Sequence, residues 1–147
     1  MDALELLKED HQKVTKLFEQ AEEAEAGQEQ KQIFGQIKRE LEAHARIEES
    51  IFYPAMEKYD ELKDMVREAI KEHKEVKTLL KEMENLVDNS QKFERKLQVL
   101  MENVEHHAEE EEEGKMFSKV RKLVDRTRLD ELGQELEAAK GKKSKAA

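Results

Sequence analysis

The sequence has no cysteine, one proline and five glycines, and aromatic residues make up 5% of its 147 positions. The lack of cysteine excludes disulfides, thiolate catalysis and cysteine-ligated iron–sulfur clusters. So little proline and glycine argues against a sheet protein, because sheets need many turns built from these residues. No apolar run approaches the roughly 18 residues of a membrane-spanning helix. The acidic stretch Met1–Glu5 is not expected to be a signal or transit peptide.

Charged residues are abundant instead, at 43% of the chain, and the net charge is −9. This composition predicts long amphipathic helices with charged outer faces around one core. The negative balance disfavours non-specific binding to nucleic acid or to an anionic membrane. We therefore expect neither nucleic acid nor a membrane as a partner. Nothing in the sequence points outside the cytoplasm, which is the expected location.

Apolar residues recur at steps of three and four along five stretches, the spacing of one helical face. Asp2, three residues before Glu5, predicts a capped start for the first helix. Pro54 predicts a kink or a change of direction, and Gly114 is expected to interrupt the fourth helix with a break or a bulge. The helices are expected at about residues 4–21, 30–53, 62–87, 93–111 and 116–139, the last broken near Asp125.

Four long helices joined by short connections predict an all-α fold, an antiparallel up-down four-helix bundle with an additional C-terminal helix. Residues 1–125 would form the bundle. Residues 126–147 would form the C-terminal helix and a basic tail, of which Lys140–Ala147 is expected to be frayed and solvated.

Polar groups interrupt the apolar stripes at matching places. Each of the four long helices has one histidine on its stripe, and two have a glutamate four residues later. These residues are His11, His44 with Glu48, His73, and His107 with Glu111. The histidines of the first half lie 33 residues apart and those of the second half 34 apart, so the two halves resemble each other. A buried carboxylate without a partner costs several kcal/mol, so the core must supply one.

A bundle would bring these six groups together. Imidazole is a good ligand for iron, zinc, copper or manganese, and a carboxylate can bridge two ions. The residues therefore predict a two-metal site in which the four histidines are terminal ligands and Glu48 and Glu111 are bridges. Two alternatives remain: each histidine alone could be a satisfied core residue, and a structural zinc site would need only one ion and four ligands.

The position of the fourth helix is ambiguous, because His106 adjoins His107 and Glu110 lies four residues after it. Apolar residues precede His107 at the stripe spacing, whereas polar residues would precede His106. His107 with Glu111 is therefore preferred, with His106 and Glu110 as possible alternative ligands.

Glu49 and Tyr53 are weaker candidates for contacts beside the ligands and are expected at the surface or its boundary. No acid, base or nucleophile stands out apart from the ligands. Any catalysis would therefore belong to the metals, with the bundle fixing geometry and access.

At these residues the chain resembles the hemerythrin-like family, also called HHE cation-binding domains, over about residues 4–125. The resemblance rests on four helices in order rather than on one short motif. The matching elements are His11, His44–Glu49 followed by Ile51–Pro54, Glu72–His73 and His106–Glu112. It implies two iron ions in a non-haem di-iron centre with carboxylate and oxo or hydroxo bridges.

The chain departs from the oxygen-carrying members of that family at Lys77, where they place a second histidine four residues after the first. One ligand fewer implies an additional open position on one iron, which favours redox turnover over reversible oxygen carriage. The resemblance thus implies a protein that binds or reacts with small oxidants such as O2, H2O2 or NO, with catalase-like activity as one candidate. The alternatives are a non-catalytic module that binds, stores or senses iron or oxygen, and a purely structural bundle.

Overall fold

The computed structural model describes residues 1–24, 27–86 and 90–146, except for the side chains of Ser90, Glu111 and residues 141–146. All regular elements in these ranges are helical. They are α1 (Ala3–Glu23), α2 (Gln28–Ile47), the π-helical η1 (Glu48–Phe52), α3 (Tyr53–Met56), the 3-10 helix η2 (Asp60–Leu62), α4 (Lys63–Glu84), α5 (Ser90–Glu105), the π-helical η3 (His106–Met116), α6 (Phe117–Leu123) and α7 (Arg126–Ala146).

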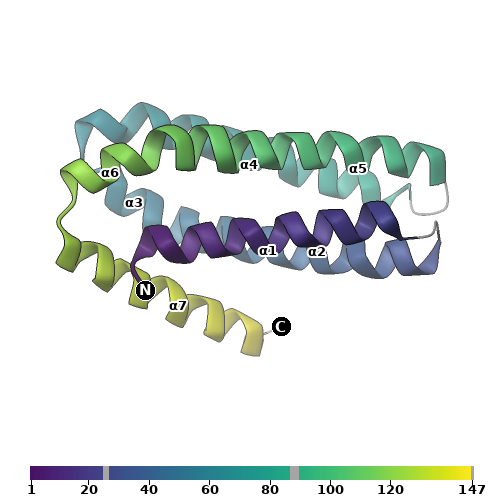
Figure 1. Cartoon of the computed structure of the whole chain (residues 1–147), viewed down its shortest axis with the longest axis horizontal. Coiled ribbons are helices and arrows are strands. Elements are labelled where there is room, and N and C mark those ends of the chain that lie inside the picture. Colours follow the sequence, from purple (N-terminus) through teal and green to yellow (C-terminus); the bar gives the residue numbers. More distant parts are fainter. Residues whose placement is uncertain (25–26, 87–89, 147) are drawn as a thin grey trace.

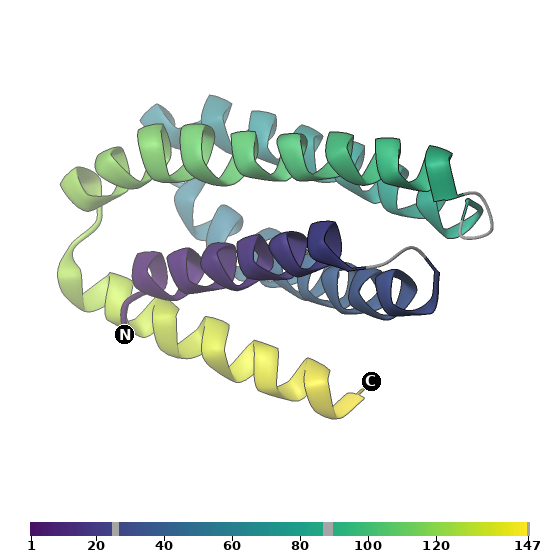
Figure 2. The same cartoon turned by 45° about the vertical axis from the view of Figure 1, so that its right-hand side comes forward.

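The long helices form an antiparallel four-helix bundle, with α5, η3 and α6 continuing one another as the fourth helix (Figure 1). The C-terminal helix α7 lies along α1 and α2, on the side away from α4 and α5 (Figure 2). The predicted all-α up-down bundle with an additional helix is confirmed. The boundary between residues 1–125 and 126–147 as separate units stays a prediction.

Helix α1 begins as predicted. The Asp2 side chain accepts a hydrogen bond from the Glu5 amide at 2.9 Å, and the Glu5 side chain accepts one from the Asp2 amide at 3.4 Å. Before α2, Gly27 has a φ of 109°, a conformation that side-chain-bearing residues rarely adopt. These local features fix where the first two helices start.

Two clusters of buried apolar side chains fill the bundle. One, near the α1–α2 and α4–α5 connections, contains Phe18, Phe34 and Phe93. The other, toward the opposite end, contains Phe52 and Phe117 together with the buried leucines of α7. Along α1 the first cluster begins at Val14 and the second ends at Leu7, so the predicted polar positions lie between the two.

The second and fourth helices of the bundle, which carry the candidate glutamates, widen into π-helical turns at η1 and η3. In η1, the Tyr53 amide donates to the Glu48 carbonyl, five residues earlier, just before Pro54, which has no N–H to donate. The chain remains helical through Pro54 and turns only after Met56. Gly114 does not interrupt the fourth helix, since η3 runs through it without a break.

Two predictions about the C-terminal part can be compared with the structure. The break near Asp125 is present, between the end of α6 and the start of α7. The prediction of frayed backbone is wrong up to Ala146, because α7 continues to that residue, and the Lys140 side chain is only 28% exposed. The predicted solvation of the side chains of residues 141–147 lies outside the described residues.

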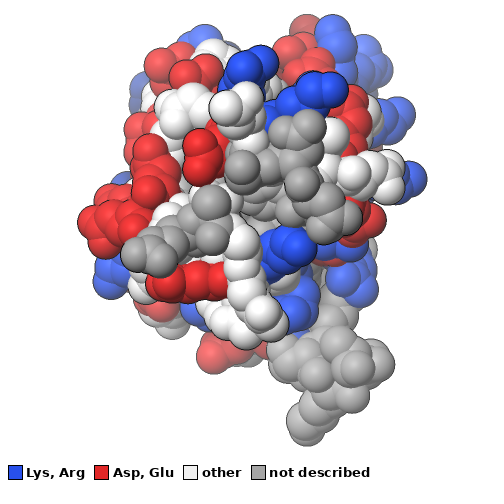
Figure 3. Space-filling view, turned by 90° about the vertical axis from the view of Figure 1, so that its right-hand side faces the viewer, with Lys and Arg blue, Asp and Glu red and all other residues white. Residues whose placement is uncertain are grey.

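The surface carries many charged side chains, as the composition predicts. At the end of the bundle that carries the α1–α2 and α4–α5 connections, acidic and basic side chains are interspersed (Figure 3). No helix in the described ranges is long and apolar enough to cross a membrane.

Gly133 allows α7 to pack against the start of the chain. A Cβ there would press against the Met1 carbonyl oxygen and lie 2.9 Å from the Asp2 carbonyl carbon, and neither backbone atom can move easily. We expect Gly133→Ala to lower the free energy of unfolding by roughly 1–3 kcal/mol, the usual effect of overpacking. Chemical denaturation would measure the loss.

Gly35→Ala is the matched control, because its nearest neighbour would be a flexible Arg39 guanidinium nitrogen 3.8 Å away. Within a helix this change should raise stability by about 0.5–1 kcal/mol. Equal effects of the two substitutions would mean that α7 does not depend on the close approach at Gly133.

Candidate metal centre

Four buried histidines from four helices meet between the two apolar clusters. Their side chains and two buried glutamates form two groups that could hold a metal ion, with the candidate ligand atoms of each group within 4.8 Å of one another. One group is His11, His44, Glu48 and Glu112; the other is Glu48, His73 and His107. Because Glu48 belongs to both groups, it lies where a bridging ligand would lie.

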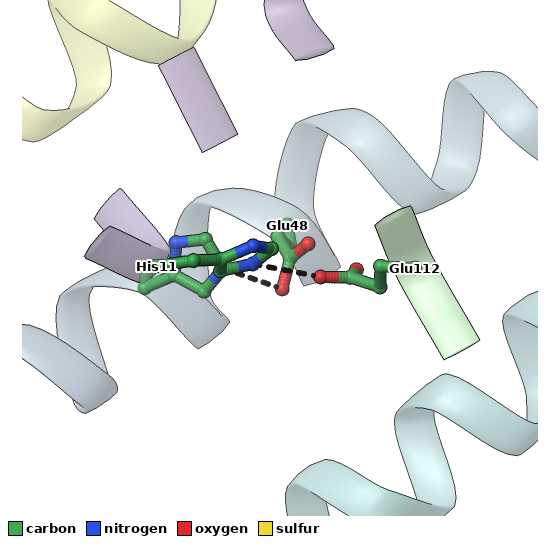
Figure 4. A group of neighbouring side chains, drawn as sticks. His11, Glu48 and Glu112 are labelled. Atoms are coloured by element: carbon green, nitrogen blue, oxygen red, sulfur yellow. Dashed lines mark hydrogen bonds and ion pairs between the residues drawn. The ribbon is translucent and has the colours of Figure 1, made fainter. Parts of the chain in front are cut away.

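The ring nitrogens converge in pairs. The Nε2 atoms of His11 and His44 are 3.2 Å apart, and those of His73 and His107 are 3.1 Å apart. Figure 4 shows His11 beside the carboxylates of Glu48 and Glu112, which come from two different helices. The four predicted histidines and Glu48 are therefore brought together.

The second carboxylate at the centre is Glu112, one residue later than the predicted Glu111. The Glu111 side chain lies outside the described residues. Glu112 Oε1 is 3.0 Å from His11 Nε2 and 3.6 Å from His107 Nε2. The prediction assumed α-helical spacing after His107. The π-helical turn of η3 instead brings a residue five positions later onto the same face.

A signal for this shift is present in the sequence. Counting back in fours from the buried residues Val124, Val120 and Met116 leads to Glu112, whereas counting forward from the apolar residues before His107 leads to Glu111. The two halves of the stripe are out of step by one residue, and a π-helical insertion is the usual way for a helix to absorb that mismatch.

The alternative pair lies outside the centre. The side chains of His106 and Glu110 are 50% and 68% exposed and contact each other at 2.9 Å. Neither belongs to the groups of candidate ligands in the described part of the chain.

Each candidate histidine is held through its other ring nitrogen. The carboxylates that contact the four Nδ1 atoms are Glu113 at 2.7 Å from His11, Asp10 at 3.1 Å from His44, Glu49 at 2.8 Å from His73 and Glu72 at 2.6 Å from His107. A carboxylate accepts hydrogen bonds, so this pattern assigns the proton to Nδ1. All four Nε2 atoms then present lone pairs to the centre, as metal-binding histidines do.

The same region contains carboxylate oxygens without donors. Among the described residues, both oxygens of Glu48 and Oε1 of Glu112 are buried without a hydrogen-bond partner. The Nε2 atoms of His44 and His73 lie 3.1 Å from Glu48 Oε1, but in the neutral ring that binds metal they are lone pairs and not donors. Unpaired buried carboxylates cost several kcal/mol, and cations between these groups would remove that cost. The residues present therefore fit a metal site.

Protons compete with metal for these positions. Burial by itself lowers the pKa of an imidazole, but the carboxylates outweigh it. Glu48 and Asp10 place the pKa of His44 well above its ordinary value, and Glu112 is the main cause that raises the pKa of His107 to about 9. Burial has the opposite effect on a carboxylate and by itself would raise the pKa of Glu48, but the His44 charge holds that pKa well below its ordinary value.

These shifts predict opposite effects of pH on the metal-free and metal-loaded protein. A histidine with a raised folded-state pKa stabilises the fold below about pH 6.5 and loses that contribution as the pH rises toward its folded value. The melting temperature of the metal-free protein should therefore fall between pH 6.5 and 8.5. Bound metal needs the deprotonated ring, so the stabilisation on adding metal should grow over the same range. Thermal melts with chelator and with metal would test this, and a metal-free melting temperature that is flat or rises with pH would contradict it.

The hydrogen-bond pattern of the first helical hairpin, α1 to η1, repeats in the second, α4 to η3. The acid directly before the first histidine of each hairpin holds the second histidine of the same hairpin. The acid directly after the central glutamate, Glu48 or Glu112, holds the first histidine of the other hairpin. The equivalent residues are Asp10 and Glu72, His11 and His73, His44 and His107, Glu48 and Glu112, and Glu49 and Glu113. The resemblance of the two halves seen in the sequence thus extends to the contacts at the centre.

One pair of equivalent positions breaks this symmetry. Tyr53 and Phe117 each lie five residues after the central glutamate of their half. The Tyr53 hydroxyl donates to Glu112 Oε2 at 2.6 Å, whereas the Phe117 ring only stacks near His11. Burial and the Glu112 charge raise the pKa of Tyr53 well above its ordinary value, so the hydroxyl keeps its proton. The two halves of the centre therefore differ by one hydrogen-bond donor.

The expected surface position of Tyr53 is wrong, since its side chain is buried at 1% exposure. The widened turn of η1 rotates Tyr53 onto the face of Glu48, where α-helical spacing would not put it. Glu49 is half-buried and contacts both His73 and Lys77. No contact with a histidine was predicted for Asp10, Glu72 or Glu113, although each adjoins a candidate ligand.

A small cavity borders the centre on the side of the first apolar cluster. Its volume is about 40 Å³, and all four candidate histidines contribute to its wall. Apolar side chains of Val14, Leu41, Leu80 and Val104 form much of the remainder. A water-sized sphere needs about 10–15 Å³, so the cavity holds only very small molecules.

Comparisons with known proteins show a cation-binding domain family. A structure of a Hemerythrin HHE cation binding domain-containing protein from Mycobacterium kansasii is similar, with a TM-score of 0.86 and 26% identity, over 97% of this chain and 86% of that one. A DNA nickase from Nostoc sp. is 28% identical over 142 residues, and the chain spans 40% of its length. The family model described as Hemerythrin HHE cation binding domain matches residues 2–120. The chain therefore belongs to the hemerythrin HHE cation-binding domain family.

Proposed function

We propose that this protein is a non-haem di-iron protein whose centre binds or reacts with a small oxidant, namely O2, H2O2 or NO. The terminal ligands in this proposal are His11, His44, His73 and His107, and the bridging ligands are Glu48 and Glu112. The observation that carries it is the set of buried carboxylate oxygens without donors, surrounded by four imidazole lone pairs. The proposal retains the cytoplasm as the predicted location.

The size and lining of the cavity support a small substrate. A space of about 40 Å³ with largely apolar walls suits a diatomic gas or a peroxide and is far smaller than the pockets that hold drug-sized organic molecules. Bound iron would supply the electron transfer that turnover of such oxidants requires. The chain's own residues orient the ligands, exclude bulk water and hold one proton at the Tyr53 hydroxyl.

Tyr53→Phe tests the role of that hydroxyl. We expect the variant to keep both metal ions, because Tyr53 is not among the candidate ligands, and to lose about 1 kcal/mol of stability with the hydrogen bond to Glu112. The near-ultraviolet absorption of the iron-loaded protein should shift, since a bridging carboxylate loses its donor. An unchanged spectrum would show that the hydroxyl does not affect the centre.

Metal analysis with absorption spectroscopy and an oxidant assay tests the proposed function. Two iron ions per chain and oxygen evolution from peroxide would support a catalase-like activity. Two ions without turnover, together with a reversible spectral change under O2 or NO, would support the non-catalytic alternative. Failure to take up two ions, with no change in melting temperature on adding iron, would reject both.

DNA nicking is a property of the Nostoc relative and is not part of this proposal. Most of that relative's length lies outside the match, and the net charge of −9 opposes binding to a phosphate backbone.

A further inference from the structure

The C-terminal helix α7 reaches the metal centre through one buried acid. Asp10 holds His44 Nδ1 with one carboxylate oxygen, at 3.1 Å, and its other oxygen contacts the Lys140 ammonium. The Asp10 side chain is only 7% exposed. A chain of two contacts therefore connects a candidate ligand to a helix outside the four-helix bundle.

Asp10 is more deeply buried than the other three carboxylates that hold histidine Nδ1 atoms. The side chains of Glu49 and Glu113 are 29% and 26% exposed and that of Glu72 is 14% exposed, so water solvates their charges more readily. Asp10 is largely shielded from water, and a buried carboxylate depends strongly on its partners. Among the described residues, Asp10 forms ion pairs with His44 and Lys140, so Lys140 supplies its cation other than the histidine.

We propose that Lys140 is a positioning residue for the half of the centre formed by His11 and His44. By holding Asp10, it keeps the His44 ring oriented with Nδ1–H donating to Asp10 and Nε2 facing the centre. Docking of α7 and occupancy of this half by metal are then linked, and each stabilises the other. This inference rests on the proposed metal centre and adds a role for α7 to it.

Lys140→Gln removes the charge and keeps a chain of similar length. Changes to the outer partners of metal-binding histidines typically weaken metal affinity by about 10–100-fold. We expect one of the two ions to be released to a chromogenic iron chelator about tenfold faster than in the unaltered chain, with the other ion unaffected. Lys140→Arg, which keeps the positive charge, should restore the slow rate.

Arg128→Gln is the matched control, because it removes one positive charge from the same helix at surface contacts with Glu131 and Glu135. It should release both ions at the rate of the unaltered chain. Hydrogen exchange gives a second readout: iron loading should increase the protection of α7 amides in the unaltered chain and in Arg128→Gln, but not in Lys140→Gln.

A double-mutant cycle tests whether Lys140 acts through Asp10. In an Asp10→Asn background, which should itself speed the release of one ion, Lys140→Gln should have no further effect. Normal release rates in Lys140→Gln, or equal effects of Lys140→Gln and Arg128→Gln, would overturn the inference while leaving the metal centre in place. If the unaltered chain takes up no metal, the proposed function fails first and this inference with it.

Discussion

Glu48→Gln is expected to leave at most one metal ion on each chain, where the unaltered protein binds two. Glu48 belongs to both groups of candidate ligands, and both of its oxygens lack donors among the described residues. Glutamine has nearly the same shape but no charge, and its NH2 group would face imidazole lone pairs. The affinity for the lost ion should fall by at least about 100-fold, more than a change in an outer partner produces.

Metal analysis after desalting, together with the near-ultraviolet spectrum, would measure the effect. Glu57→Gln is a suitable control, since this exposed glutamate lies beyond the end of α3 and carries the same charge. Far-ultraviolet circular dichroism would verify that both variants remain helical. Two ions bound to Glu48→Gln with a normal spectrum would show that Glu48 is not a ligand.

A second pair of substitutions decides which acid of η3 holds the metal. We expect Glu112→Gln to lose an ion, because Glu112 is fully buried and lies 3.0 Å from His11 Nε2. We expect Glu111→Gln to retain both ions. The two variants differ by one position in the same acidic run and carry the same change in charge, so each is the control for the other.

The metal content of both proteins, measured side by side, gives the answer. Loss of an ion from Glu111→Gln but not from Glu112→Gln would mean that α-helical spacing holds after His107 and that the π-helical turn does not set the ligand. Loss from both would indicate that the acidic run as a whole supports binding, rather than one carboxylate.

The bundle and five of the six central groups could be predicted because they depend on helical periodicity. The stripe through Phe34, Leu41, His44 and Glu48 keeps one spacing along α2 and into the start of η1, and tertiary packing buries it. Glu112 could not be placed by the same rule, since a π-helical turn adds one residue to the period. The expected position of Tyr53 was wrong for the same reason.

The outer carboxylates were beyond a periodic argument. Asp10 and Glu72 directly precede their neighbouring histidines, so helical spacing assigns them to the flank of the stripe and not to its centre. Their role depends on which histidine they meet across the bundle, and that is a property of how the helices pack. The contact of Lys140 with Asp10 likewise spans 130 positions of the chain.

The crossed hydrogen bonds at the centre have a mechanical consequence. Glu113 holds His11 and Glu49 holds His73, so each hairpin steadies a ring that belongs to the other. Bound ions would cross-link the two hairpins, while the contacts within each hairpin would remain without the ions. Removing the ions should therefore destabilise the interface between the hairpins before either hairpin unfolds. The affinity for metal would then set the stability of that interface.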